Sequence, residues 1–257
     1  MIMQPASDIK TSCPCDRITL WVSGHQSIAR LIITTIGLIV VLLVMPSYLR
    51  NIFWDGIQNH KILTGLLLIF GILAVSLVWS AGQIIDTWVF SYFNVYGDRS
   101  IWMDRFMFAF TQLGSGISAL VFTLVLFFTN NRRLAYELIL GSVLLWLIVL
   151  LIKILIHRSR PSFQLEEARI IGGRAFGHSF PSGHTSQAFF LAVLLTNFFH
   201  VSIWVNLLFF AAALMVGITR MYVGAHYPRD VLAGIVLGSA WGLIWLVSSG
   251  YVLDRIG

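Results

Sequence analysis

Long apolar stretches with almost no charged residue constrain the fold of this chain more than any other feature of its sequence. The only charged residues inside them are Lys153 and Asp230, and the stretches cover residues 62–81, 107–128, 138–156, 185–199, 203–218 and 230–250. A helix needs about 20 apolar residues to cross a bilayer, where every backbone polar group must be satisfied internally. The sequence therefore predicts an all-α, polytopic membrane helical bundle with six core transmembrane helices. An extra N-terminal transmembrane helix is predicted over 31–46.

The overall composition leads to the same fold class. Only 11% of the 257 residues are charged, whereas soluble domains carry about 25%. No polar stretch is long enough to fold by itself, so we expect no separate soluble domain. We divide the chain into an N-terminal tail with its extra hydrophobic segment, residues 1–61, and a membrane domain, residues 62–257. Residues 1–28 lack the pattern of a removed signal peptide.

The charge balance and the cysteines restrict the partners. A net charge of +6 favours contact with anionic membrane lipids. No basic run or recognition motif stands outside the apolar stretches, which argues against nucleic-acid binding, and nothing indicates an obligate protein partner. Cys13 and Cys15 are too few for a structural zinc site. Incidental thiols are the simplest interpretation, with lipidation and redox chemistry as the alternatives.

The arginines predict the orientation in the membrane. Arg132 and Arg133 form a basic turn between two apolar stretches, which the positive-inside rule assigns to the cytoplasm. Counting onward, segments 157–183 and 219–229 lie on the external face. Segment 157–183 itself contains four arginines, and a functional demand for positive charge would explain this exception. We interpret 83–106 as an external loop with an interfacial amphipathic piece.

The first of three polar motifs contains Lys153, followed by Arg160 and Pro161. A lone lysine near a helix end commonly extends its ammonium group to the membrane surface. Here Pro161 also ends the helix and holds Arg160 near that surface. The two cations together suit an anionic ligand.

The second motif is Pro181-Ser182-Gly183-His184, at the start of the next apolar stretch. A helix start offers free backbone N–H groups and the positive end of the helix dipole to an anion. Ser182 can cap the helix or donate to an oxyanion, and Gly183 allows the backbone to approach a ligand closely. An ordinary turn is the alternative, but His184 beside two cationic motifs favours an anion site.

The third motif contains Arg220, His226 and Asp230. The four-residue spacing brings His226 and Asp230 to one face of a first helical turn, so the carboxylate can orient the imidazole. The other ring nitrogen is then available as a nucleophile or a base. A structural His–Asp pair is the alternative for this motif taken alone.

These three motifs resemble the signatures of the type 2 phosphatidic acid phosphatase (PAP2) family, whose superfamily includes vanadium haloperoxidases and bacterial acid phosphatases. One departure is Thr219, where the family usually has serine. The resemblance implies a PAP2-like catalytic domain over 62–257, with His226 as the nucleophile that forms a phosphohistidine. It implies that Asp230 orients His226 and that His184 is the general acid and base. It further implies phosphate binding by Lys153, Arg160, Ser182, Gly183 and Arg220.

The resemblance implies an integral membrane phosphatase, which we expect in a bacterial inner membrane. The orientation predicted from the arginines puts its active site at the external or periplasmic face. The lipid phosphate substrates that the resemblance suggests are polyprenyl diphosphate, phosphatidate, phosphatidylglycerophosphate and lipid A phosphate. No acidic cluster is present to bind magnesium, so we expect a metal-independent enzyme without a cofactor. The alternatives are a lipid phosphotransferase with the same intermediate and a non-catalytic lipid transporter.

Four further residues surround the motifs in segment 157–183: Arg158, Arg169, Arg174 and His178. A solvated loop is one interpretation. The other is a lid that binds the lipid headgroup, with Gly172 and Gly173 as its hinge.

Overall fold

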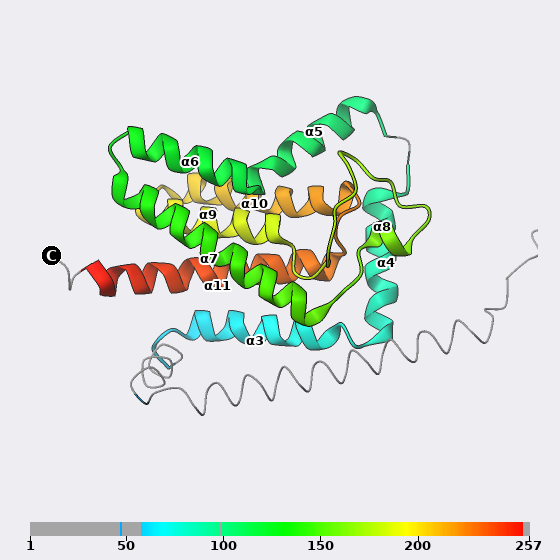
Figure 1. The fold of residues 1–257 in the computed structure, drawn as a ribbon, viewed down its shortest axis with the longest axis horizontal. Helices are drawn as coiled ribbons and strands as arrows, with labels where there is room; N and C mark the ends of the chain where they lie inside the picture. Colours follow the sequence, from blue (N-terminus) through cyan, green and yellow to red (C-terminus); the bar gives the residue numbers. More distant parts are fainter. Residues whose placement is uncertain (1–46, 48–57, 98, 254–257) are drawn as a thin grey trace, which may run out of the picture. The chain divides into compact units, whose positions relative to one another are not determined.

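A computed structural model describes residues 47, 58–97 and 99–253, and no strand occurs among them (Figure 1). Segment 31–46 and the two cysteines lie outside these residues, and the division of the chain at residue 61 stays a prediction. The described helices are α3 (Lys61–Ser76), α4 (Ser80–Asn94), α5 (Ile101–Thr111), α6 (Gly116–Phe128), α7 (Arg132–Ile156), α8 (Pro161–Gln164), α9 (Gly183–Phe198), α10 (Ile203–Tyr222) and α11 (Pro228–Leu253).

Several of these helices identify an integral membrane protein. Among the described residues, three helical segments are long and apolar enough to cross a membrane: Arg132–Gln164, Ile203–Tyr222 and Pro228–Ser248. Two bent helix pairs raise the number to five if each pair forms one span, with bends of 98° between α3 and α4 and 59° between α5 and α6. The all-helical membrane fold is therefore confirmed, while the count of six spans stays a prediction.

Helix α9 is the centre of the bundle. Every residue from Thr185 to Thr196 is buried, and α7, α10 and α11 pack around it (Figure 1). A helix without a distinct polar face, which is apolar throughout Ala188 to Leu195, requires such a position. The closest neighbour is α11, where Gly234, Gly238 and Gly242 recur every four residues against α9. A Cβ atom at Gly242 would come within 2.6 Å of Val193, so the absent side chains allow the two backbones to approach.

Segment 83–106 is largely helical, so the prediction that it is a loop is wrong, while its external position stays a prediction. Helix α4 occupies Ser80–Asn94, and α5 begins at Ile101 after Ser100, whose hydroxyl accepts a hydrogen bond from the Met103 amide. In α4, Trp88 is exposed while Asp86 is buried. Asp86 and Asn94 therefore face the protein interior, whereas Arg99 and Arg105 are exposed, a division that the amphipathic pattern alone could not predict.

The predicted span 107–128 is not one straight helix. A short 3-10 turn, Gln112–Gly114, separates α5 from α6, and Ser115 caps α6 by accepting a hydrogen bond from the Ser118 amide. Gly114 lies directly against the His184 carbonyl, where a side chain would not fit. The break thus brings this turn to the start of α9.

Candidate active site

The three polar motifs meet at one end of the bundle. The first lies at the end of α7 and the start of α8, the second at the start of α9, and the third at the end of α10 and the start of α11. Successive helices run in opposite directions, so these ends share one side. A cleft of about 650 Å³ opens there, and its polar end is lined by Lys153, Arg160, Gly183, His184, Arg220 and His226.

The buried imidazole of His226 has a defined tautomer. Its Nε2 lies 3.3 Å from Nη1 of Arg160, which can only donate a hydrogen bond. Nε2 is therefore the unprotonated nitrogen that accepts this hydrogen bond, and the ring proton is on Nδ1. Burial lowers the pKa of His226 well below its ordinary value, and Arg160 and Arg220 act in the same direction against Asp230. The result is a neutral imidazole whose basic nitrogen borders the cleft.

Asp230 faces the other nitrogen of this ring at a longer distance than predicted. Its Oδ2 is 3.6 Å from Nδ1 of His226, which is beyond a hydrogen bond and leaves Nδ1 without a partner among the described residues. The same oxygen accepts hydrogen bonds from the Ser179 hydroxyl and from the Tyr227 amide, the latter at 2.9 Å. The carboxylate is thus held firmly beside the ring.

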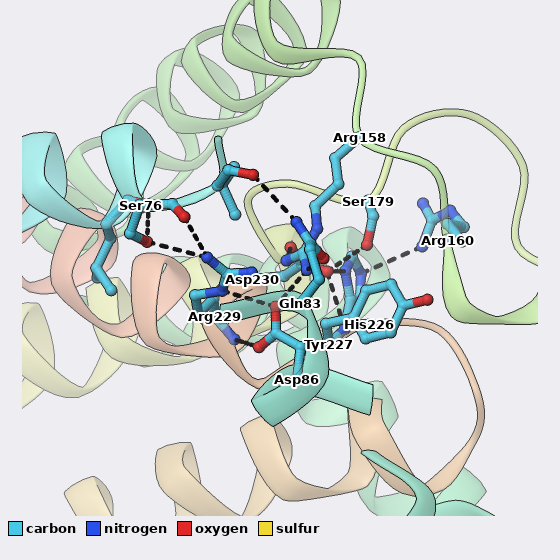
Figure 2. Close-up of polar contacts among 12 residues, drawn as sticks. Ser76, Gln83, Asp86, Arg158, Arg160, Ser179, His226, Tyr227, Arg229 and Asp230 are labelled. Atoms are coloured by element: carbon cyan, nitrogen blue, oxygen red, sulfur yellow. Dashed lines mark hydrogen bonds and ion pairs between the residues drawn. The ribbon is translucent and has the colours of Figure 1, made fainter. Parts of the chain in front are cut away.

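Arg158 supports Asp230 from the far side. Its Nη1 donates to Oδ1 of Asp230 at 2.5 Å, and its Nη2 donates to Asp86 of α4 and to Oε1 of Gln83 at 2.9 Å (Figure 2). The guanidinium also stacks 4.5 Å from the ring centre of Tyr227, whose pKa burial raises to about 12. Arg158 is buried beneath the site, so its predicted place in a headgroup lid is wrong.

A second arginine completes this buried ionic network. Arg229 donates through Nε to Asp86 at 2.7 Å and through Nη1 to the Ser76 carbonyl at 2.5 Å (Figure 2). Two arginines thus face two carboxylates, Asp86 and Asp230, and the four charges balance. Buried charges require such pairing. The network ties α3 and α4 to the start of α11.

Sequence reasoning missed Asp86, Arg229 and Ser179, which act within this network. Asp86 is far from every motif, and the interpretation of 83–106 as a loop placed it in water. The sequence does show that Asp86 is an ionisable residue in an apolar segment next to a predicted span. Such a residue usually has a function or a charged partner. The partners of Asp86 could not be identified without the packing of α4 against α11.

The predicted phosphate-binding cations differ in how they are held. Arg160 donates to the carbonyl oxygens of Phe176, Gly177 and Ala225 at 2.9–3.0 Å, which fixes its guanidinium beside His226. Arg220 donates through Nη1 to the Thr111 hydroxyl at 3.0 Å, and its Nε has no partner among the described residues. Arg220 also lines the cleft, so a bound oxyanion could accept a hydrogen bond from its guanidinium.

The start of α9 has the form of an anion site, with one change from the prediction. The Ser182 hydroxyl is fully buried and lies 2.9 Å from the Thr185 hydroxyl, so it is already paired inside the protein. Gly183 borders the cleft, and a Cβ there would meet only Val149 at 3.5 Å. The backbone N–H of Gly183 is thus better placed for a ligand than the Ser182 side chain.

The remaining lid candidates separate in space. Arg169 donates to Asp104 at 2.7 Å, and its backbone exchanges two hydrogen bonds with the Asn94 side chain, which anchors the loop to α4 and α5. Arg174 stacks 5.0 Å from the ring of Phe163. Of the four candidates, only His178 lines the cleft.

Comparison with known proteins agrees with this architecture. Residues 133–253 match the PAP2 superfamily. The lipid A 1-phosphatase of Rhizobium etli is 39% identical over 37% of this chain and 41% of its own length, so the chain spans about two fifths of that relative. The lipid A 4'-phosphatase of Bacteroides thetaiotaomicron is 30% identical over 63% of this chain and 75% of its own length.

A solved structure extends the likeness to the fold. The transmembrane PAP2-type phosphatidylglycerolphosphate phosphatase of Bacillus subtilis aligns with a TM-score of 0.64 at 24% identity, over 74% of this chain and 96% of its own. Together with the Bacteroides relative and the matched residues 133–253, this similarity shows that the chain belongs to the PAP2 superfamily.

Proposed function

We propose that the protein is a membrane phosphatase that hydrolyses a phosphomonoester or pyrophosphate on a lipid. The observation that carries the proposal is the buried His226, whose Nε2 is unprotonated, with Lys153, Arg160 and Arg220 around the same cleft. Phosphoryl transfer needs little besides a positioned nucleophile and stabilisation of charge on the phosphoryl oxygens. The named phosphatases among the relatives support the same reaction class.

In the first step, Nε2 of His226 attacks phosphorus, and the bond from phosphorus to the leaving oxygen breaks. His184, in the imidazolium form that the bound anionic phosphate favours, donates a proton to that oxygen, so that the lipid leaves as an alcohol or a shorter phosphate. The resulting phosphohistidine ring is positively charged, and Asp230 stabilises it from the Nδ1 side. The phosphoryl charge is stabilised by the three cations and by the Gly183 N–H.

In the second step, water attacks phosphorus and gives its proton to His184, which is now the base. The bond between phosphorus and Nε2 breaks, inorganic phosphate leaves, and His226 returns to its neutral form. Each residue thus ends in the protonation state in which it began. The cations supply the charge stabilisation that a metal gives elsewhere, so the reaction is expected to proceed without a metal.

The relatives indicate the substrate, and the charge pattern indicates the location. The lipid A phosphatases among the relatives favour a lipid A phosphate, with phosphatidate, phosphatidylglycerophosphate and polyprenyl diphosphate as the other members of the predicted set. The basic turn at Arg132 and Arg133 favours a cytoplasmic position for the opposite end of the bundle. The cleft would then open at the external face of a bacterial inner membrane.

The test is phosphate release from these lipids by the detergent-solubilised protein in EDTA. Wild type should release phosphate, and His226→Ala should not. The matched control is His200→Ala, which removes an exposed histidine from the turn after α9 and should keep full activity. Full turnover by His226→Ala would overturn the assignment of the nucleophile. Release only when an acceptor lipid is present would instead identify a phosphotransferase, and no release from any lipid would favour a transporter.

A further inference from the structure

The cleft continues from the polar site into the apolar part of the bundle. One face of α7 lines it, because Ile139, Val143, Trp146 and Leu150 recur at helical spacing along the wall. These residues span 11 positions, or about 17 Å along the helix axis at 1.5 Å per residue. The wall is long enough to lie beside the hydrocarbon chain of a lipid whose phosphate is at the polar end.

Two polar side chains interrupt this apolar wall. Gln187 of α9 donates through Nε2 to the hydroxyl of Ser142 of α7 at 2.7 Å, and both side chains are buried and line the cleft. No other hydrogen bond among the described residues involves the Gln187 side chain, so its carbonyl oxygen and second N–H are available. A packed apolar wall would not need this pair, and a buried polar group is costly where nothing pairs with it.

The depth of the pair indicates which part of a lipid it meets. Gln187 is three residues after His184 on the same face of α9, about 4.5 Å further along the axis. Ser142 is seven residues before Val149, which lies beside Gly183, or about 10 Å along α7. The pair therefore lies just below the phosphate site, where the unit that joins the phosphate to the hydrocarbon must pass.

We propose that Gln187 and Ser142 select lipids whose phosphate is attached to a unit with hydroxyl, ester or amide groups, as in an acylated glycerol or sugar. Such a unit can hydrogen-bond to the free groups of Gln187. A polyprenyl phosphate presents bare hydrocarbon at this depth and leaves these groups unpaired. This inference rests on the proposed phosphatase function and narrows its substrate class.

The test compares hydrolysis of three monophosphates by the full-length protein: phosphatidate, lipid A 1-phosphate and polyprenyl monophosphate. Wild type should have a higher kcat/KM for at least one of the acylated lipids than for the polyprenyl lipid. Gln187→Leu, which keeps the side-chain volume, should lower that ratio about five- to tenfold, the change expected from one neutral hydrogen bond. Comparison of the two acylated lipids then distinguishes glycerol from sugar as the unit that Gln187 contacts.

The matched control is Gln112→Leu, the same change at an exposed position that does not line the cleft; it should leave the ratio unchanged. The proposal that Gln187 selects the substrate would be overturned by an unchanged ratio of kcat/KM values in Gln187→Leu. It would also be overturned by a wild type that prefers polyprenyl monophosphate. If Gln187→Leu is inactive on every lipid, the same ratio is measured in Ser142→Ala. A lowered ratio supports the proposed selection of acylated lipids, and an unchanged ratio refutes it. Failure of the proposed function looks different, because wild type would then hydrolyse none of the three.

Discussion

Asp86 of α4 and Asp230 of α11 bind opposite nitrogens of the same guanidinium, that of Arg158. A residue outside every sequence motif is thereby joined, through one arginine, to the carboxylate beside His226. Asp86 does not border the cleft, so any effect on catalysis must act through the position of Arg158 and Asp230. We regard Asp86 as a positioning residue.

Asp86→Asn should lower stability and slow turnover without weakening substrate binding. The change leaves Arg158 and Arg229 with one fewer compensating charge in the interior, and breaking a buried ion pair costs about 3–5 kcal/mol. We expect a lower thermal midpoint in detergent, and a kcat reduced about tenfold or more at an unchanged KM, measured below the unfolding range. A KM that rises with kcat unchanged would argue against the positioning role.

The control for that variant is Asp104→Asn. Asp104 also pairs with an arginine, Arg169, but both side chains are partly exposed and Asp104 does not line the cleft. Partly exposed pairs contribute about 0–1 kcal/mol, so both stability and kcat should change little.

Asp230→Asn should be far more harmful to catalysis than Asp86→Asn. An amide cannot balance the positive charge of the phosphohistidine ring, and it can hold the ring in the wrong tautomer. Loss of an orienting carboxylate in a comparable His–Asp arrangement costs about 10⁴-fold in kcat. Single-turnover formation of the phosphoenzyme, followed with radiolabelled lipid, measures the step directly. Glu137→Gln, in the surface pair with Arg133, is the control and should form phosphoenzyme at the wild-type rate.

His184→Ala should be sensitive to the leaving group. If His184 protonates the departing oxygen, its removal should slow hydrolysis of a lipid alkyl phosphate about 10²–10⁴-fold. A nitrophenyl phosphate needs no such proton, so phosphoenzyme formation from it should be much less impaired. Equal losses on both substrates would contradict the role of general acid.

Acid should destabilise wild type more than a variant without the buried imidazole. The pKa of His226 is lowered in the folded protein, so below about pH 6.5 the unfolded chain binds a proton that the native state does not. Stability is therefore retained above that pH and lost as the pH falls, at up to about 1.4 kcal/mol per pH unit. The measurement is the thermal midpoint of wild type and of His226→Gln at about six pH values between roughly pH 7.5 and 5. The midpoint should fall less steeply with decreasing pH in the variant. Parallel curves would show that His226 is not buried in neutral form.

The sequence was sufficient for features that depend on local pattern. Apolar stretches predicted helices at α7, α9, α10 and α11, and turn residues such as Pro161 and Gly183 predicted where the site-bearing ends lie. Because successive membrane helices run in opposite directions, the ends that carry the motifs were expected on the same side of the bundle. Features that depend on packing between distant helices could not be predicted: the inward face of α4, the break before α6, and the burial of Arg158. An arginine in a charged loop has the same sequence pattern whether it faces water or two carboxylates.

The ionic network also extends beyond the region that matches the superfamily. The superfamily match begins at residue 133 and includes Arg158 and Arg229. Both arginines donate to Asp86, which precedes the matched region. A chain that began at the matched boundary would keep every catalytic motif and still carry two interior arginines with only Asp230 to balance them. The helices that carry the signature motifs therefore depend on α4, which lies outside the matched region. Its Asp86 supplies a negative charge that the buried arginines beside the site require.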